Sequence, residues 1–250
     1  MTKKMNVLVT GSAGVIGRAV CRELAGRGHA VRGFDLGPSP ELADGRVGSV
    51  ADRPTVDAAM AGIEAVVHLA ATPHDYDFMS DLLPNNIVGT YHIMDSAQQH
   101  GVRRLVFAST MQVISKVTPA DGRCVRVADG VGPANLYAAT KVCGEALGQV
   151  YAQHDMSVIA VRIGWLPRSA AEAQSAAGSR HVRSVYLSHA DAGRFFACAI
   201  AATGIKFAVV FATSRPDGES VLDPEPARRL LSFDPVDRYP EGLPWPMAVT

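Results

Sequence analysis

A tyrosine and a lysine four residues apart, Tyr137 and Lys141, are the side chains best suited to proton transfer in this sequence. Positions i and i+4 share one face of a helix, so the phenol and the ammonium group would be neighbours. Because a nearby cation favours the phenolate, the spacing predicts a lowered tyrosine pKa. Such a phenol can act as a general base toward an alcohol. The same spacing occurs on ordinary surface helices, so its meaning depends on what accompanies it.

A glycine-rich turn accompanies it. Gly11, Gly14 and Gly17 follow a short apolar run and open a segment with helical periodicity over 15–26. A strand, a tight turn and a helix N-terminus in this order bind the pyrophosphate of a dinucleotide through free backbone N–H groups. Asp35 ends the next predicted strand, about 20 residues further on, where an acid binds the adenosine ribose. Because a carboxylate there repels the 2′-phosphate of NADP, the pattern predicts NAD as the cofactor.

The elements that would position these residues alternate along the first two thirds of the chain. Apolar strands are expected at 65–69, 104–108 and 157–161, and helices around 87–94 and 136–151, the latter with Leu136, Cys143, Leu147, Val150 and Tyr151 as its apolar stripe. Strands this apolar, each followed by a helix, form a parallel sheet covered on both faces. We therefore expect an α/β fold, a Rossmann-type doubly wound parallel sheet. Its NAD-binding core would span 1–165, and a small C-terminal substrate lobe over 166–250 would be integrated with it.

The rest of the chain is less regular. The stretches 115–134 and 167–183 are predicted to be long loops, because the first is polar and rich in glycine and proline and the second is rich in alanine and serine. Short strands are expected at 184–187 and 207–212, with a helix over 191–202 between them. From residue 232 onward the prolines predict extended chain.

Composition excludes several classes of function. Lysine plus arginine (24) equals aspartate plus glutamate (24), so we expect no nucleic-acid partner and no attachment to an anionic membrane. The four cysteines have no CxxC spacing, which argues against disulfides and against a metal site and suits the cytoplasm. The N-terminal apolar run is too short for a signal peptide or a membrane span.

Further motifs follow in order along residues 5 to 165. They are His-Leu-Ala-Ala at 68–71, Asn-Ile-Val-Gly-Thr at 86–90, Phe-Ala-Ser-Thr at 107–110, Tyr137 with Lys141 and Glu145, and Arg-Ile-Gly at 162–164. Together with the glycine-rich turn and Asp35, they resemble the extended branch of the short-chain dehydrogenase/reductase superfamily, the NAD-dependent sugar-nucleotide epimerases and dehydratases.

That resemblance implies roles for matching positions. Lys141 would bind the nicotinamide ribose and tune Tyr137. The family's third catalytic residue, a hydroxyl, lies five residues before a glycine that Ser115 replaces here; counting back gives Thr110, with Ser109 as the alternative. The catalytic residues would thus be Thr110, Tyr137 and Lys141. The cofactor would contact Gly11, Gly14, Val15, Ile16, Gly17, Asp35, Ser49, Val50, Leu69, Ala70, Ala71, Asn86, Ala108, Ser109, Tyr137, Lys141 and Ile163.

On the substrate side, the short C-terminal part and residues 184–191 look most like uronate dehydrogenases, but the polar contacts differ. Met111 and Gln112 replace Asn-His, Trp165 replaces a serine, Pro73 replaces a serine, and the family's carboxylate-binding arginine aligns near His181. We therefore hypothesise a substrate other than a plain hexuronate. The residues expected to bind substrate are Thr72, His74, Thr110, Met111, Gln112, Trp165, Arg180 and Arg183. Arg168 could, like Arg180 and Arg183, bind a carboxylate or a phosphate, since arginine makes bidentate contacts.

The implied reaction is hydride transfer between NAD and a sugar, sugar acid or similar small polyol, with Tyr137 as the base. A 4,6-dehydratase is disfavoured, because Met111 and Gln112 cannot transfer protons as an Asp-Glu pair would. Two alternatives stay open: a sugar epimerase that retains its NAD, and a non-catalytic dinucleotide-binding regulator. The resemblance also implies a homodimer formed through helices near 82–99 and 136–153.

Overall fold

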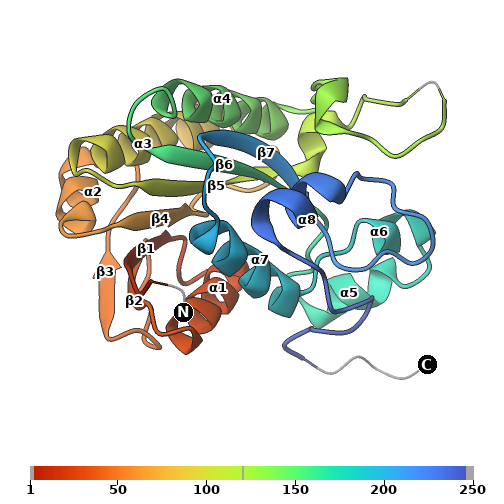
Figure 1. Ribbon diagram of the computed structural model, residues 1–250, viewed down its shortest axis with the longest axis horizontal. Helices are drawn as coiled ribbons and strands as arrows, with labels where there is room; N and C mark the ends of the chain where they lie inside the picture. The colour runs from red at the N-terminus through yellow and green to blue at the C-terminus, as the bar shows by residue number, and fades with distance from the viewer. Residues whose placement is uncertain (1–2, 120, 246–250) are drawn as a thin grey trace.

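A single parallel sheet organises the molecule (Figure 1). The computed structural model describes residues 3–119 and 121–245. Seven strands are arranged in the order β3-β2-β1-β4-β5-β6-β7, and every neighbouring pair is parallel. The strands are β1 (Asn6–Thr10), β2 (Ala30–Asp35), β3 (Asp44–Val47), β4 (Ala65–His68), β5 (Arg104–Thr110), β6 (Ser157–Ile163) and β7 (Phe207–Ala212). The predicted Rossmann-type sheet is confirmed.

Helices cover both faces of this sheet (Figure 1). On one side lie α2 (Arg53–Met60), α3 (Gly89–Gln99) and α4 (Leu136–Tyr151). On the other lie α1 (Val15–Gly26) and α7 (His189–Ala201), which pack on each other, and α8 (Glu225–Leu231) against β7. Each face has its own apolar core, because successive residues of a strand point to opposite sides: Val7 and Val9 face one core, Leu8 the other.

The strand order reverses between β1 and β4. From β1 the chain proceeds outward to β2 and β3, then returns to β4 on the opposite side of β1. The loops after β1 and β4 therefore diverge and leave a crevice at the carboxyl ends of the strands, where ligands bind in open α/β sheets. The glycine-rich turn follows β1, and Thr110 ends β5 at the same edge.

The segment after β6 differs from the prediction. Residues 167–183 contain two short helices, α5 (Ala170–Ala176) and α6 (Arg180–Ser184), and 184–187 is not a strand: only Tyr186 forms an isolated bridge, with Trp165. Serines begin both helices, since the hydroxyls of Ser169 and Ser179 accept hydrogen bonds from the third helical N–H. The alanine- and serine-rich composition of this segment therefore belongs to short helices with serine caps, and the loop prediction is wrong there.

The described residues of the segment 115–134, which are 115–119 and 121–134, are irregular as predicted, apart from a 3₁₀ turn, η3 (Val127–Asp129), and an isolated bridge between Val125 and Leu222. A second 3₁₀ turn, η2 (Met111–Ile114), directly follows β5, and a wide π-helical segment, η1 (Phe78–Val88), leads into α3. Both bring the chain back to the crevice from the ends of β5 and β4.

The apolar stripe predicted for α4 is confirmed only in part, because Tyr151 and Leu147 pack into the core but two other members do not. Leu136 and Val150 are about half exposed, and the buried face carries small and polar residues such as Lys141, Gly144 and Glu145. The ring of Phe107 explains this arrangement, because a Cβ at position 144 would overlap it. The helix thus lies close on β5, and its buried face is free to carry functional groups.

The C-terminal lobe is attached to α7 by a buried carboxylate. Asp191 is fully buried and accepts hydrogen bonds from the backbone N–H groups of Val236 and Asp237, while Arg194 bridges Asp191 and Asp237. The predicted division at residue 165 stays a prediction, although β7 and α7, which follow it, complete the sheet and one helical layer.

Candidate active site

The turn after β1 admits only glycine at two of its positions. Gly11 has φ +71, and a Cβ there would lie 2.9 Å from the backbone nitrogen of Ala70. A Cβ at Gly17 would overlap the carbonyl oxygen of Gly11. No side chain caps α1 at Gly14, and its first turn holds no acid. The free N–H groups of that turn are therefore available to an anion such as a pyrophosphate.

Two cavities meet at this turn and form one groove. The larger, of about 530 Å³, extends toward α4, and the smaller, of about 220 Å³, toward β2 and the loop after β3. Both are lined by Gly11, Gly14, Leu69 and Ala71. An elongated groove that crosses a helix N-terminus at its middle has the form that a dinucleotide requires.

Most residues predicted to bind the cofactor line this groove. The larger cavity holds Val15, Ile16, Gly17, Ala108, Ser109, Tyr137, Lys141 and Ile163, and the smaller holds Asp35, Ser49, Val50 and Ala70. Asn86 is the exception: it is buried and hydrogen-bonds the backbone of Thr72 and the hydroxyl of Thr140, whereas its neighbour Asn85 lines the smaller cavity. The motif located the segment correctly but the facing side chain incorrectly.

Asp35 stands at the ribose end of the groove. One carboxylate oxygen accepts the N–H of Ala13 at 2.9 Å and the other the N–H of Gly37 at 3.4 Å. These two bonds hold the carboxylate beside the glycine-rich turn, and each oxygen keeps a lone pair for a ribose hydroxyl.

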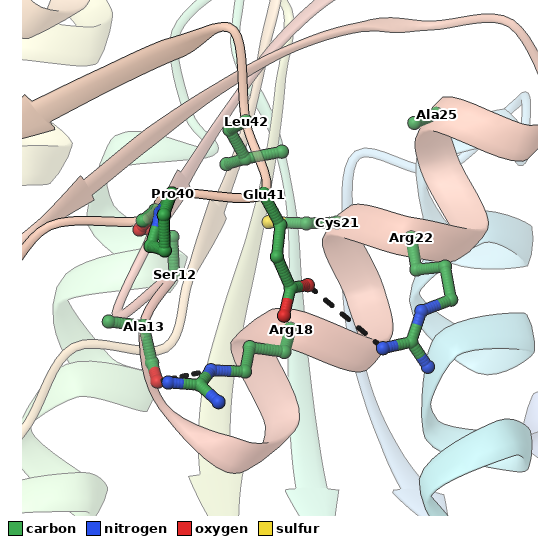
Figure 2. Close-up of a pocket in the computed structure, with 10 residues that line it drawn as sticks. Ser12, Ala13, Arg18, Cys21, Arg22, Ala25, Pro40, Glu41 and Leu42 are labelled. Carbon is green, nitrogen blue, oxygen red and sulfur yellow. Dashed lines mark hydrogen bonds and ion pairs between the residues drawn. The ribbon is translucent and has the colours of Figure 1, made fainter.

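A third cavity, of about 280 Å³, adjoins this end on the outer side of α1 (Figure 2). Its two arginines are both engaged: Arg18 donates to the carbonyl of Ala13 at 3.0 Å, and Arg22 lies 4.0 Å from Glu41. Ala13 thus bonds Asp35 through its N–H and Arg18 through its carbonyl. Arg18 is therefore linked to Asp35 through the backbone of one residue.

The N-terminus of α4 is held in place from two loops. Asn135 caps it by accepting the N–H of Ala138 at 2.8 Å, and it also donates to the side chain of Gln112. Asp75, in the loop after β4, accepts the N–H groups of Leu136 at 3.0 Å and Tyr137 at 3.3 Å. The backbone of Tyr137 is therefore fixed by a carboxylate 62 residues away in sequence.

Tyr137 projects from this turn into the larger cavity, and Thr110 lies beside it. Burial raises the pKa of the phenol, and the guanidinium of Arg168 and a hydrogen bond with Thr110 act in the opposite direction. The predicted net lowering is thus wrong for the protein without ligands, because the sequence shows the charge partner but not the desolvation.

Lys141 lies one turn further along the same face. Its ammonium group is 5.7 Å from the centre of the Tyr137 ring and donates to the carbonyl of Ala108 at 3.0 Å. Burial lowers the pKa of Lys141 to about 8, because a charged form is poorly solvated there.

A buried ion pair connects α4, which carries Tyr137 and Lys141, to β6. Arg162 on β6 makes two hydrogen bonds of 2.9 Å to Glu145 on α4, and Ser109 donates to the same carboxylate at 2.6 Å. The hydroxyl of Ser109 is therefore engaged with Glu145, whereas that of Thr110 interacts with Tyr137. This geometry favours Thr110 over Ser109 as the third catalytic residue.

The predicted substrate residues divide into two groups. His74, Thr110, Met111, Gln112 and Trp165 line the larger cavity, and Thr72 lines the smaller one. Arg180 and Arg183 line neither: both belong to α6, and Arg183 is held by Asp217 and the carbonyl of Ala177. Because 167–183 forms helices, these arginines are directed away from the crevice.

Several lining residues were not assigned to the site from the sequence. They are Pro73, Ser115, Gly164, Leu166, Arg168 and Glu172 in the larger cavity, and Phe34, Leu36, Gly48 and Asn85 in the smaller. Leu36 directly follows Asp35 and Gly164 belongs to a motif, so adjacency was a usable signal. Nothing in the sequence distinguishes Arg168 from the other arginines nearby.

Among residues 3–119 and 121–245, no cluster of potential metal ligands and no helix long and apolar enough to cross a membrane is found. His68, at the end of β4, is buried, and its ring bonds the hydroxyls of Thr10 and Thr90. Burial lowers the pKa of His68 to about 3, so the ring stays neutral and serves packing.

Comparison with known proteins places this site in a family. The model described as "NAD dependent epimerase/dehydratase family" matches residues 7–190. NAD-dependent glucose-6-phosphate dehydrogenase of Haloferax volcanii is 32% identical, over 94% of this chain and 94% of that protein. L-arabinose 1-dehydrogenase (NAD(P)(+)) of the same organism is 36% identical, over 74% and 78%. A variant of uronate dehydrogenase from Agrobacterium tumefaciens complexed with NAD superposes with a TM-score of 0.81, at 26% identity, over 94% of this chain and 86% of that chain. The chain belongs to the NAD dependent epimerase/dehydratase family, as its ordered motifs predict.

Proposed function

We propose that this protein is an NAD-dependent oxidoreductase that transfers a hydride between NAD and a sugar, sugar acid or similar small polyol. One observation carries the proposal: Tyr137, Lys141 and Thr110 meet in one cavity, at the end of a groove whose glycine-rich turn fits a pyrophosphate. The similar dehydrogenases of sugars and sugar acids support the substrate class.

The residues divide the work as follows. Asp35 would bind the adenosine ribose, the N-terminus of α1 the pyrophosphate, and Lys141 the nicotinamide ribose. Bound NAD⁺ accepts the hydride from the carbinol carbon. Thr110 hydrogen-bonds the substrate oxygen, and Tyr137 as phenolate takes its proton, so the alcohol becomes a carbonyl. The guanidinium of Arg168 and the hydrogen bond with Thr110 oppose the desolvation that raises the phenol pKa.

The direct test mixes the purified protein with NAD⁺ and a panel of sugars, aldonates, uronates and sugar phosphates, and follows the near-ultraviolet absorbance of NADH. Steady accumulation with one class of substrate is expected. If tightly bound nucleotide is released only on denaturation and no NADH accumulates, while sugars interconvert, the protein is an epimerase instead.

Cofactor preference gives a sharper prediction. Replacing Asp35 with Ala removes the charge that repels a 2′-phosphate and exposes the ribose to Arg18 and the adjoining cavity. We expect the ratio of kcat/KM for NAD over NADP to fall at least about tenfold, which corresponds to ~1.4 kcal/mol. The matched control is Glu23→Ala, which removes a carboxylate on α1 that pairs with Arg27 and lines none of the three cavities, and should leave the ratio unchanged. An unchanged ratio in Asp35→Ala contradicts the ribose assignment.

We also propose a homodimer. The outer face of η1, α3 and α4 exposes Met79, Tyr91, Leu136 and Val150, each between 44% and 69% accessible. Light scattering after size exclusion should give about twice the chain mass of 26.4 kDa. Val150→Glu should shift the protein to the monomer mass, while Val131→Glu, on a loop outside this face, should not. A wild-type protein at the chain mass disproves the dimer.

We also propose a cytoplasmic location and a division of labour along the chain. The cytoplasmic location is supported by the four cysteines, all of which are free thiols. Fractionation of cells that express the tagged protein tests this location. The division of labour proposed here assigns the cofactor, the catalytic residues and most substrate contacts to residues 1–165, and the lobe that follows contributes Leu166, Arg168 and Glu172 to the lining of the larger cavity.

A further inference from the structure

Arg168 differs from the other arginines near the cavity. It follows β6 and lines the larger cavity, which also contains Tyr137 and Thr110, and its side chain is exposed to solvent. By contrast, Arg162 is neutralised by Glu145, and Arg183 by Asp217. Within residues 3–119 and 121–245, no carboxylate lies within salt-bridge distance of the Arg168 guanidinium.

The neighbours of Arg168 leave its charge uncompensated. Its Nη1 donates to Nε2 of His74, across the cavity from the loop after β4. A guanidinium can only donate, so Nε2 of His74 is the acceptor of this hydrogen bond. The one acid nearby, Glu172, accepts the backbone N–H of Arg168 at 2.7 Å, and Ser169 caps the backbone N–H of Glu172. Glu172 is thus directed at the backbone of α5 rather than at the guanidinium.

The backbone at His74 shows that this contact is imposed by the fold. His74 has φ +66, a conformation that non-glycine residues seldom adopt, and the next residue, Asp75, is tied to the N-terminus of α4. The loop therefore presents an imidazole to Arg168 from one side while it holds the catalytic helix on the other. Strain of this kind is concentrated where ligands are bound.

From these contacts we propose that Arg168 binds an anionic group of the substrate, a carboxylate or a phosphate, so that the substrate is an anionic sugar rather than a neutral one. This inference rests on the proposed function and names its substrate class. A planar guanidinium with unpaired N–H groups binds either anion in a bidentate manner. The positive charge of Arg168 also acts on Tyr137 and lowers its pKa. When the anionic group of the substrate binds, it would neutralise this charge.

Arg168 lies at a different place from the position at which uronate dehydrogenases are expected to carry their carboxylate-binding arginine. The segment that aligns with the carboxylate-binding arginine of uronate dehydrogenases contains His181, which belongs to α6 and does not line the cavity. Arg168 would take over this role from the other side of α5.

The test compares matched pairs of neutral and anionic sugars with NAD⁺: glucose against glucuronate, and glucose against glucose 6-phosphate. The wild type should have the higher kcat/KM for one anionic member. In Arg168→Gln the ratio of kcat/KM for that anionic sugar over glucose should fall about 10- to 100-fold, mainly through the KM of the anionic sugar, because any effect of the lost charge on Tyr137 is common to both substrates. Arg229→Gln, on exposed α8, is the matched control, and Arg180→Gln tests the arginine predicted from sequence; neither should change this ratio.

The anionic sugar whose kcat/KM falls in Arg168→Gln identifies the group that Arg168 binds. A fall for glucuronate indicates a carboxylate, and a fall for glucose 6-phosphate indicates a phosphate. Equal loss for glucose and both anions, a wild-type preference for glucose, or a larger loss in Arg180→Gln overturns the inference while leaving the oxidoreductase function intact. If no sugar is oxidised, the proposed function fails, and calorimetric titration of the NAD⁺-loaded protein with glucuronate and glucose 6-phosphate decides the inference separately. Binding that Arg168→Gln abolishes supports it, and absence of binding to both anions rejects it.

Discussion

Replacing Tyr137 with Phe is expected to lower kcat by about 10²- to 10⁴-fold, the range that a positioned proton-transfer group contributes. The substitution removes only the hydroxyl. The ring, its position above Lys141 and the cap that Asp75 provides to the helix stay in place. Affinity for NAD⁺, measured by titration, should therefore change little, and the loss should appear in the rate of NADH formation.

Tyr91→Phe is the matched control, since Tyr91 lies exposed on α3, outside the groove. Its kcat should equal that of the wild type. Full activity of Tyr137→Phe would show that another group takes the substrate proton, and the proposed mechanism would be wrong. Loss of NAD⁺ affinity together with kcat would instead assign Tyr137 to cofactor binding.

Replacing Glu145 with Gln should reduce the free energy of unfolding by about 3–5 kcal/mol, because the change leaves a buried guanidinium without its counter-charge. The side chains of Arg162 and Glu145 are only 3% and 9% exposed, and Ser109 bonds the same carboxylate. Urea denaturation should show a lower midpoint with an unchanged slope.

Glu64→Gln provides a control of identical chemistry. Glu64 also pairs with two cations, Lys3 and Arg103, but its side chain is 30% exposed. The expected loss there is about 0–1 kcal/mol, because water solvates the partners once the charge is removed. Equal losses in the two variants would contradict the view that burial makes the Glu145 pair indispensable.

The cofactor half could be predicted from sequence because its determinants are local. Gly11 and Gly17 are required by backbone contacts within one turn, and Asp35 ends the strand next to β1. Such constraints require particular residue types at fixed distances along the sequence. The pattern alone therefore located the groove and the order of the elements.

The substrate half depends on packing between distant segments, which spacing does not encode. Arg180 and Arg183 resemble anion ligands as much as Arg168 does, and only the capped helices α5 and α6 decide which of them lines the cavity. The buried face of α4 was only partly predicted for a related reason: Tyr151 and Leu147 do pack inward, but the middle of the face is shaped by Phe107 on β5, against which only a glycine fits at position 144.

The two ends of the groove are built from different kinds of structure, and this has an evolutionary consequence. The cofactor end is formed by strand ends and the first turn of α1, where an added methyl group already collides with backbone. Trp165, Arg168 and His74 stand on connecting segments whose replacement leaves the sheet unchanged. Descendants of such a protein can acquire new substrates by altering a few loop positions, while the hydride chemistry is inherited without modification.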